Sequence, residues 1–323
     1  MSENLKVGDS VNKVMVVAKK VKRDFSNGKF FLFQFSDKNG TVKGVWWDPA
    51  READNIKAND IVRVTGEIQE YQGTIQIRVN YMEVLAEGEY DPSVFLPSSS
   101  RDVESIYSGI LEIIGDVKDK DLAALLNLIF SDDQFRERFV RSPAAKGWHH
   151  SYVGGLAEHM YDMVRIAQAV AGVYSEVDRD LLITGVLLHD LGKMSELAVG
   201  NHIDYSDRGR LLGHISMGVT LFEEYLRGME DFPSELEMKL KHMILSHHGQ
   251  LEHGSPVVPM TVEALALNFI DNMDAQVRGT VMVMEKGGGE GRWSDYVRLL
   301  DRFIYKGNGD REISGDEDGG EDG

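Results

Sequence analysis

The residues best suited to chemistry lie near the middle of this 323-residue chain. His189 and Asp190 stand side by side at the end of an apolar run that begins at Leu181. Both side chains need polar partners once they are removed from water, and a divalent metal ion would satisfy the two together. We therefore interpret this pair as the start of a metal site and look for its other ligands among the remaining histidines.

Nine of the ten histidines lie between His149 and His248. A single histidine on a helix is more often a packed core residue than a ligand, but several groups in one helical region indicate a metal site. The groups are His149-His150, His159, His189-Asp190, His214 and His247-His248, with Asp271 further on. The chain has no cysteine. Histidine and carboxylate ligands without thiolate suit Mn²⁺, Fe²⁺, Co²⁺ or Zn²⁺.

A carboxylate that bridges two ions would give this cluster a defined chemistry. Asp190 could hold two ions roughly 3.5–4 Å apart, and such a pair activates water and stabilises a pentacovalent phosphorus transition state. Lys193 is placed to meet a phosphate oxygen, with Arg208 or Arg210 as a second candidate. The pattern predicts metal-assisted hydrolysis of a phosphoester.

The part of the chain that carries the histidines has the apolar spacing of helices. Val103, Ile106 and Ile110 recur at steps of three and four residues, and a similar series spans 122–129. Further helices are expected near 131–140, 155–173, 178–190, 212–228, 234–247, 259–285 and 292–305. No strand alternation reappears, so this part is predicted to be all-α.

The N-terminal part has the period of two that is typical of strands. Phe31, Phe33 and Phe35 fall on one face, with polar turn residues between successive runs. Five strands are expected near 11–23, 29–36, 41–47, 61–70 and 74–85, with a short helical piece over 49–56. This is the order of an OB-fold barrel. The predicted fold class is multidomain, with an all-β OB-fold barrel followed by an all-α bundle.

OB folds bind single strands by stacking bases on aromatic side chains beside basic ones. The candidate platforms are Trp46, Trp47 and Tyr71, and only one of the two adjacent tryptophans can face the core. The basic candidates precede the first turn: Lys19, Lys20, Lys22 and Arg23. We select Trp46, Tyr71, Lys20 and Lys22 for substrate binding. The alternatives are that the aromatics fill the barrel and that the lysines form a solvated edge.

The net charge of −18 is unevenly distributed. Residues 1–88 hold 13 basic and 12 acidic residues, whereas 310–323 hold seven acids and one base, for −6. We expect an OB-fold domain over 1–88, a linker over 89–101, a helical domain over 102–306 and a disordered acidic tail over 307–323. No signal peptide or apolar run of about 20 residues is present, so a soluble, cytoplasmic protein without membrane contact is expected.

The motifs resemble those of the HD-domain metal-dependent phosphohydrolases. The matching residues are His159, His189-Asp190 with Gly192-Lys193, His214, His247-His248 and Asp271. The segments 149–159, 209–214, 246–249, 254–256 and 270–275 are more specifically similar to YhaM-type 3′→5′ exoribonucleases, which place an OB fold ahead of the HD domain. The resemblance covers roughly residues 5–305 and leaves the acidic tail outside.

The resemblance implies a two-ion site, with Mn²⁺ as the first choice of metal. His159, His189, Asp190 and Asp271 would hold one ion. His214 and one or both of His247 and His248 would hold the other, bridged by Asp190. The implied catalytic residues are Asp190, Lys193 and His150, where His150 contacts substrate or protonates a leaving group and packing is its alternative role. His149 is a weaker candidate, and His202, His242 and His253 are assigned to surface or packing. Asp274 could orient a ligand histidine.

The implied function is a metal-dependent 3′→5′ exoribonuclease that releases nucleoside monophosphates from single-stranded RNA, with single-stranded DNA as a further substrate. Two alternatives stay open. The chain could hydrolyse a small nucleotide, although a strand-binding domain argues against it. It could also be a non-catalytic single-strand-binding protein, although the full set of ligand groups argues against that.

Overall fold

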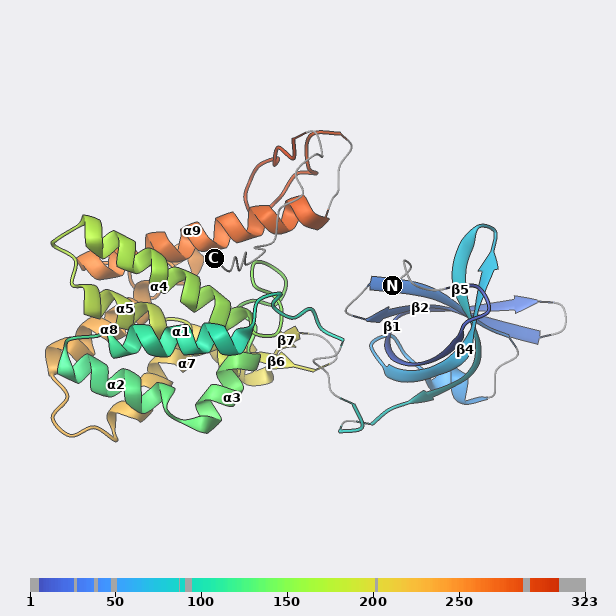
Figure 1. The fold of residues 1–323 in the computed structure, drawn as a ribbon, viewed down its shortest axis with the longest axis horizontal. Coiled ribbons are helices and arrows are strands. Elements are labelled where there is room, and N and C mark those ends of the chain that lie inside the picture. Colours follow the sequence, from blue (N-terminus) through green and yellow to red (C-terminus); the bar gives the residue numbers. More distant parts are fainter. Residues whose placement is uncertain are drawn as a thin grey trace, which may run out of the picture.

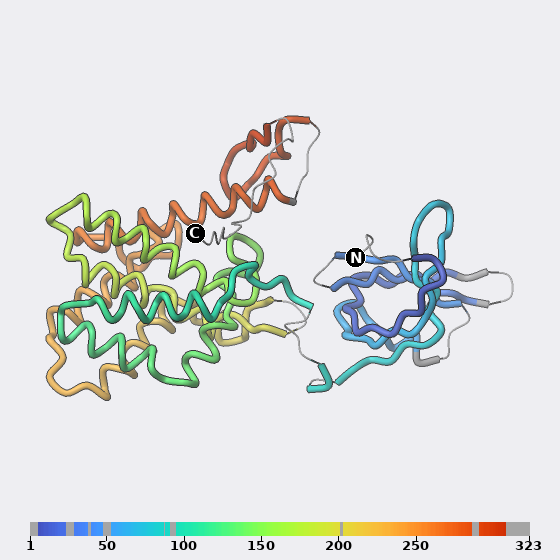
Figure 2. Tube along the Cα trace, viewed as in Figure 1, coloured from blue at the N-terminus to red at the C-terminus, as the bar shows by residue number. Residues whose placement is uncertain are grey.

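The computed structural model describes residues 6–25, 28–37, 40–47, 51–86, 88–90, 95–200, 203–286 and 291–307. Within them the chain forms a strand-rich N-terminal part and a helical C-terminal part joined by an extended segment (Figures 1 and 2). The expected acidic tail after residue 307, the middle of the expected linker (91–94) and His202 lie outside the described residues.

Five strands close into a barrel with the order β1-β2-β3-β5-β4. They are β1 (Ser10–Phe25), β2 (Gly28–Asp37), β3 (Gly40–Trp47), β4 (Ile61–Tyr71) and β5 (Thr74–Val84). All neighbours pair antiparallel except β3 and β5, which pair in parallel. Gly44 allows the close packing, because a Cβ there would overlap the ring of Phe35. The predicted OB-fold barrel is confirmed.

Alternation along β2 and β3 fills the barrel. Phe31, Phe33 and Phe35 are buried, and Trp46 is only 6% exposed in the same core. The prediction that Trp46 offers a platform for bases is therefore wrong, because its ring has no open face. Its neighbour Trp47 points the other way and is 51% exposed.

Lys20 is used inside the barrel domain. Its ammonium donates to the carbonyls of Ala53 (2.5 Å) and Ile56 (2.8 Å) and lies 4.5 Å from the ring centroid of Phe31. Ala53 lies within the 3₁₀ helix η2 (Arg51–Asn55) and Ile56 directly follows it, so Lys20 ties this helix to β1. The selection of Lys20 for substrate binding is corrected, because its donors are already engaged.

We predict that Lys20→Met destabilises the barrel, because it removes a charged donor from several carbonyls at once. The free energy of unfolding should fall by about 1–3 kcal/mol. Lys22→Met is the matched control, since Lys22 is exposed on the same strand, and it should change stability by less than about 0.5 kcal/mol. Urea denaturation measures both. Equal effects of the two substitutions would contradict a structural role for Lys20.

The C-terminal part is helical, as predicted. The helices are α1 (Val103–Gly115), α2 (Lys120–Phe130), α3 (Asp133–Arg141), α4 (Gly155–Val173), α5 (Arg179–Leu188), α6 (Lys193–Glu196), α7 (Asp207–Leu226), α8 (Ser234–Ser246) and α9 (Val262–Lys286). Helix α5 is buried along its whole apolar run, Leu181 to Leu188, and contacts α4, α8 and α9. Among the described residues, no helix meets the length and apolarity needed to cross a membrane.

Two local predictions fail. The helix expected over 292–305 is absent: the segment makes isolated bridges, Trp293 with Tyr305 and Val297 with Arg302. Its aromatic residues contact each other across the two arms, as in the Trp293–Tyr305 ring pair at 5.1 Å. A small hairpin, β6 (Leu197–Val199) and β7 (Ile203–Tyr205), interrupts the helical part. Three-residue strands are too short for alternation to reveal them.

The described ends of the connecting segment are held in place. Phe95 packs with Leu85 and other barrel residues, whereas Leu96 packs with Leu197 and Ile203 of the hairpin. Beyond them, the carbonyl of Pro97 and the amide of Ser99 both pair with Val153, at 2.9 and 3.0 Å. The segment therefore pairs with the loop that carries His149 and His150.

Candidate metal centre

The end of α5 delivers His189 and Asp190 into the interior of the helical part. Their side chains are 0% and 1% exposed. Burial alone would raise the pKa of Asp190, but Lys193 and His189 lower it well below its usual range. The ammonium of Lys193 lies 2.6 Å from Asp190 Oδ2. Asp190 is therefore an ionised carboxylate, and this is the state that ligates a metal.

The two oxygens of Asp190 face different pairs of histidines. On one side, His189 Nε2 and His159 Nε2 lie 3.3 and 3.5 Å from Asp190 Oδ2. On the other, His214 Nε2 and His247 Nε2 lie 3.5 and 3.6 Å from Oδ1. Two donors that each bind one ion at about 2.1 Å are about 3.0–3.4 Å apart. The spacing therefore fits one ion on each side of the carboxylate.

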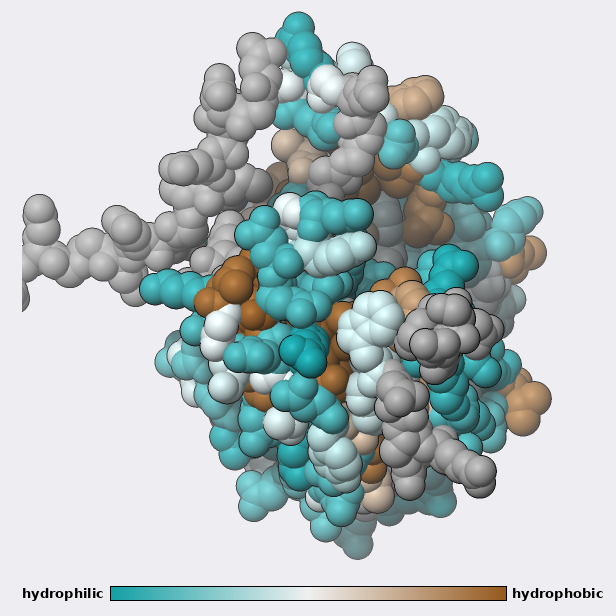
Figure 3. Space-filling view, turned by 90° about the vertical axis from the view of Figure 1, so that its right-hand side faces the viewer, coloured by the Kyte–Doolittle hydropathy of each residue, from teal (hydrophilic) through white to brown (hydrophobic). Residues whose placement is uncertain are grey.

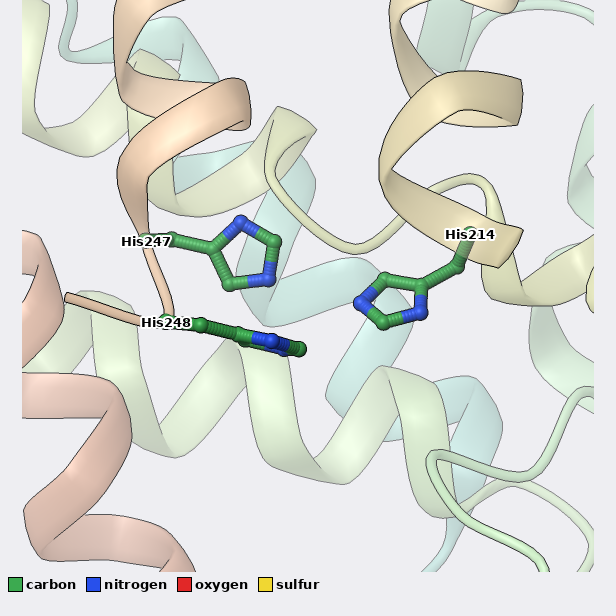
Figure 4. A group of neighbouring side chains, drawn as sticks. All are labelled: His214, His247 and His248. Atoms are coloured by element: carbon green, nitrogen blue, oxygen red, sulfur yellow. The ribbon is translucent and has the colours of Figure 1, made fainter. Parts of the chain in front are cut away.

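Each side has a third donor. Asp271 Oδ1 lies 3.4 Å from His159 Nε2 and completes a group with His189. His248 completes a group with His214 and His247, and Figure 4 shows these three rings facing one another. Consecutive residues of a helix would diverge by about 100°, but α8 ends at Ser246. Both His247 and His248 belong to the group and are candidate ligands.

The Nδ1 atoms of the histidines are held by acceptors. His189 Nδ1 donates to the Val186 carbonyl and His247 Nδ1 to the Ile244 carbonyl, both at 2.7 Å. The other pairs are His159 with Asp274 (2.7 Å), His214 with Glu196 (3.1 Å) and His248 with the carbonyl of His253 (2.8 Å). A carbonyl can only accept, so the proton sits on Nδ1 and the lone pair on Nε2.

The inward-facing atoms have no protein partner. Among the described residues, Nε2 of His159, His189, His214 and His247 and Oδ1 of Asp190 are buried without a hydrogen bond. Burial alone lowers the pKa of His159, but the carboxylates of Asp190, Asp271 and Asp274 raise it well above its usual value. These carboxylates therefore favour a positive charge at this point, and a divalent ion in place of the His159 proton would supply it. The residues present fit divalent ions.

His150 has no free ring nitrogen. Its Nδ1 contacts the Tyr152 hydroxyl at 2.9 Å and its Nε2 contacts Asp274 Oδ2 at 3.0 Å. Asp274 also holds His159, as expected for a residue that orients a ligand. The expectation that His150 contacts substrate is corrected to its alternative, a packing role. His149 is different, because its buried Nδ1 has no hydrogen-bond partner in the described part of the chain and burial lowers its pKa to about 3.

Two buried carboxylates escaped sequence reasoning, and the first of them supports the site. Glu196 Oε1 holds His214 at both its Nδ1 and its amide, the latter at 2.9 Å. Glu158 is 4% exposed and accepts from Ser99 Oγ at 2.6 Å. The available signal for Glu196 was its position three residues after Lys193, one helical turn away. Nothing in the sequence connects Glu158 with Ser99.

The other predicted substrate residues lie outside the cluster. Arg208 is exposed on the first turn of α7, and Arg210 Nη2 pairs with Asp204 Oδ1 at 2.8 Å. Lys22 is exposed on β1, and Tyr71 is 61% exposed at the turn between β4 and β5. Only Lys193 reaches the metal ligands. Its pKa is raised, because Asp190 and Asp271 outweigh the opposing effect of burial.

The barrel carries a stacked aromatic pair on its outer surface that includes Trp47, the exposed neighbour of Trp46. The rings of Phe30 and Trp47 stack with centroids 4.5 Å apart at 25°. Arg23 pairs with Phe30 across β1 and β2, so the three residues form one row on three strands. Figure 3 views this end of the molecule and shows apolar side chains scattered among hydrophilic ones. A base can stack on such a row beside a cation.

We predict that Glu196→Ala weakens one metal site without removing a ligand. Loss of the carboxylate frees the ring of His214, and such supporting contacts are worth about 10–100-fold in metal affinity. Titration of Mn²⁺ into metal-free protein by calorimetry should show one site weakened and one retained. Glu235→Ala is the control, since Glu235 is exposed and pairs with Lys239 on the same helix. Equal affinities in both variants would rule out the supporting role.

Comparison with known proteins gives two family matches and two close relatives. Residues 156–276 match the HD domain, and residues 13–85 match the OB-fold nucleic acid binding domain. The chain is 34% identical to the 3′-5′ exoribonuclease YhaM of Bacillus subtilis over 305 residues, covering 93% of this chain and 96% of that protein. The same protein of Bacillus licheniformis is also 34% identical, over 307 residues and with the same coverage. One chain in a solved structure of a replication protein A heterotrimer bound to single-stranded DNA is similar to 27% of this chain. The match covers 65% of that chain at 21% identity, with a TM-score of 0.22.

Proposed function

The chain belongs to the family of YhaM 3′-5′ exoribonucleases, and on this premise we propose that it removes nucleotides from the 3′ end of single-stranded RNA with the help of divalent metal ions. The observation that carries the metal requirement is the set of buried Nε2 atoms around Asp190 that have no protein partner among the described residues. The OB-fold domain supports a polymeric, single-stranded substrate.

Two groups of residues would hold the ions. His159, His189 and Asp271 with Asp190 Oδ2 form one group; His214, His247 and His248 with Asp190 Oδ1 form the other. When bound, the ions supply Lewis acidity to a phosphate oxygen and lower the pKa of a water molecule. The donors are nitrogens and carboxylate oxygens without thiolate, which suit Mn²⁺, Fe²⁺, Co²⁺ or Zn²⁺, and we propose Mn²⁺ as the first of these.

The protein's own groups bind and orient the strand. The ammonium of Lys193, fixed beside Asp190, would donate to a nonbridging phosphate oxygen. Trp47 and Tyr71 would stack bases while Lys22 and Arg23 meet phosphates. Water adds to the terminal phosphorus, the bond to the 3′ oxygen breaks, and a nucleoside 5′-monophosphate leaves. Stacking does not involve the 2′-hydroxyl, so single-stranded DNA is proposed as a second substrate.

Metal removal tests the proposed activity directly. On 5′-labelled single-stranded RNA, we expect a ladder that shortens from the 3′ end, no cleavage after EDTA treatment, and recovery with Mn²⁺. Asp190→Ala should lose at least about 10³-fold in rate, because both groups of ligands share its carboxylate. Asp295→Ala, at an exposed position away from the site, should act like the unmodified protein. Internal fragments or activity in EDTA would contradict the proposal.

Two variants distinguish the proposed roles of His149 and His150. His149→Ala should leave the Mn²⁺ stoichiometry intact but lower kcat/KM about tenfold, because a free nitrogen beside the site can hydrogen-bond to substrate. His150→Ala should lower Mn²⁺ affinity about tenfold, because Asp274 then holds His159 less firmly. Calorimetry and steady-state kinetics on both proteins decide. The opposite pattern would return the substrate-contacting role to His150.

A further inference from the structure

An exposed tyrosine on the hairpin is flanked by two cations from different parts of the chain. Tyr205, at the end of β7, is 40% exposed. Lys146 Nζ and Arg210 Cζ lie 5.6 and 5.7 Å from its ring centroid. Lys146 comes from the loop before His149, whereas Arg210 comes from the first turn of α7. Both cations lie over the ring, and an aromatic ring beside cations is a composition that binds single-stranded nucleic acid.

Asp204 holds Tyr205, Lys146 and Arg210 in place when no nucleotide is bound. Its Oδ1 accepts from Lys146 Nζ at 2.7 Å, from Arg210 Nη2 at 2.8 Å and from the amide of Tyr205 at 2.7 Å. The hydrogen bond from Lys146 is the largest cause that lowers the pKa of Asp204 to about 2, so the carboxylate stays ionised. Side chains that are already ordered lose less entropy when a ligand binds.

The hairpin is tied to the supporting residues of the metal centre. Ser206, the residue after Tyr205, donates from its amide to the Glu196 carbonyl at 2.9 Å and from its hydroxyl to the Ser195 carbonyl at 2.8 Å. Glu196 in turn holds His214. Gly209 keeps α7 close, because a Cβ there would overlap the Glu196 backbone. The place of Tyr205 relative to His214 is therefore fixed by backbone contacts.

The same hairpin meets the segment that leads to the barrel. Leu96 of that segment packs on Leu197 and Ile203. Figure 1 shows β6 and β7 at the end of the helical part from which the chain runs to the barrel. The hairpin therefore lies on the side of the helical part that faces the barrel.

We propose that Tyr205, with Lys146 and Arg210, forms a nucleotide subsite that holds single-stranded RNA upstream of the bond to be cut. A base stacks on the exposed part of the Tyr205 ring, and the adjoining phosphates meet the two cations and Arg208. In a chain with a net charge of −18, such a local group of cations supplies attraction that the whole molecule does not. This inference rests on the proposed function and adds a binding site to it.

The subsite is tested by measuring RNA binding under conditions in which the RNA is not cleaved. Metal-free protein in EDTA is titrated into 5′-fluorescein single-stranded RNA, and anisotropy gives Kd. Tyr205→Ala should weaken binding at least about fivefold, as expected for one lost stacking contact, while Tyr205→Phe stays within about twofold. Tyr174→Ala is the matched control, because Tyr174 is 58% exposed and lines a separate pocket with Phe269. Lys146→Ala should lower the slope of log Kd against log salt by about 1.

If Tyr205→Ala binds the RNA as tightly as the unmodified protein does, the proposed subsite is wrong. If that variant melts at a lower temperature, cross-linking of 4-thiouridine RNA to the unmodified protein decides instead. An adduct on the peptide that contains Tyr205 supports the subsite, and cross-links found only elsewhere contradict it. The 3′-end assay on the unmodified protein is read separately. If the protein degrades RNA but Tyr205 has no effect on RNA binding, the subsite proposal alone is wrong. If the protein does not degrade RNA, the proposed function itself is wrong.

Discussion

The burial of one ionised carboxylate, that of Asp190, is the constraint on which the helical part depends. An aspartate that is 1% exposed at the end of an apolar helix is strongly unfavourable unless cations surround it. Lys193 supplies one positive charge, and the histidine pairs on either side leave lone pairs that need Lewis acids. Helices α4, α5, α7, α8 and α9 each bring at least one residue to this point from their ends or inner faces.

The supporting contacts explain why these helices begin and end where they do. Helix α8 ends at Ser246, so two consecutive histidines can turn inward. Helix α6 is a single turn that brings Lys193 to Asp190 and Glu196 to His214. Asp274 does the same for His159 from α9. The ligands are thus oriented before any ion binds, which favours a defined geometry over a flexible one.

Residue types and spacing were enough to predict the barrel, the helical part and the residues that gather around Asp190. It was harder to predict which of two neighbouring side chains faces the core. Alternation shows that Trp46 and Trp47 point apart, but not which of them is buried. The role of Lys20 depends on carbonyls more than 30 residues away in the chain, and sequence carries no sign of such contacts. The choice between His149 and His150 depends on Asp274 and Tyr152, which only the fold brings near His150. The hairpin with Tyr205 was too short for its period to be seen.

The central claim is that the Asp190 carboxylate bridges two metal ions. Crystals of the protein soaked in MnCl₂ and measured at the manganese absorption edge test it most directly. The account predicts two anomalous peaks, one beside His159, His189 and Asp271 and one beside His214, His247 and His248, with an oxygen of Asp190 next to each. A single peak on one side of Asp190, or manganese bound only elsewhere, would contradict it.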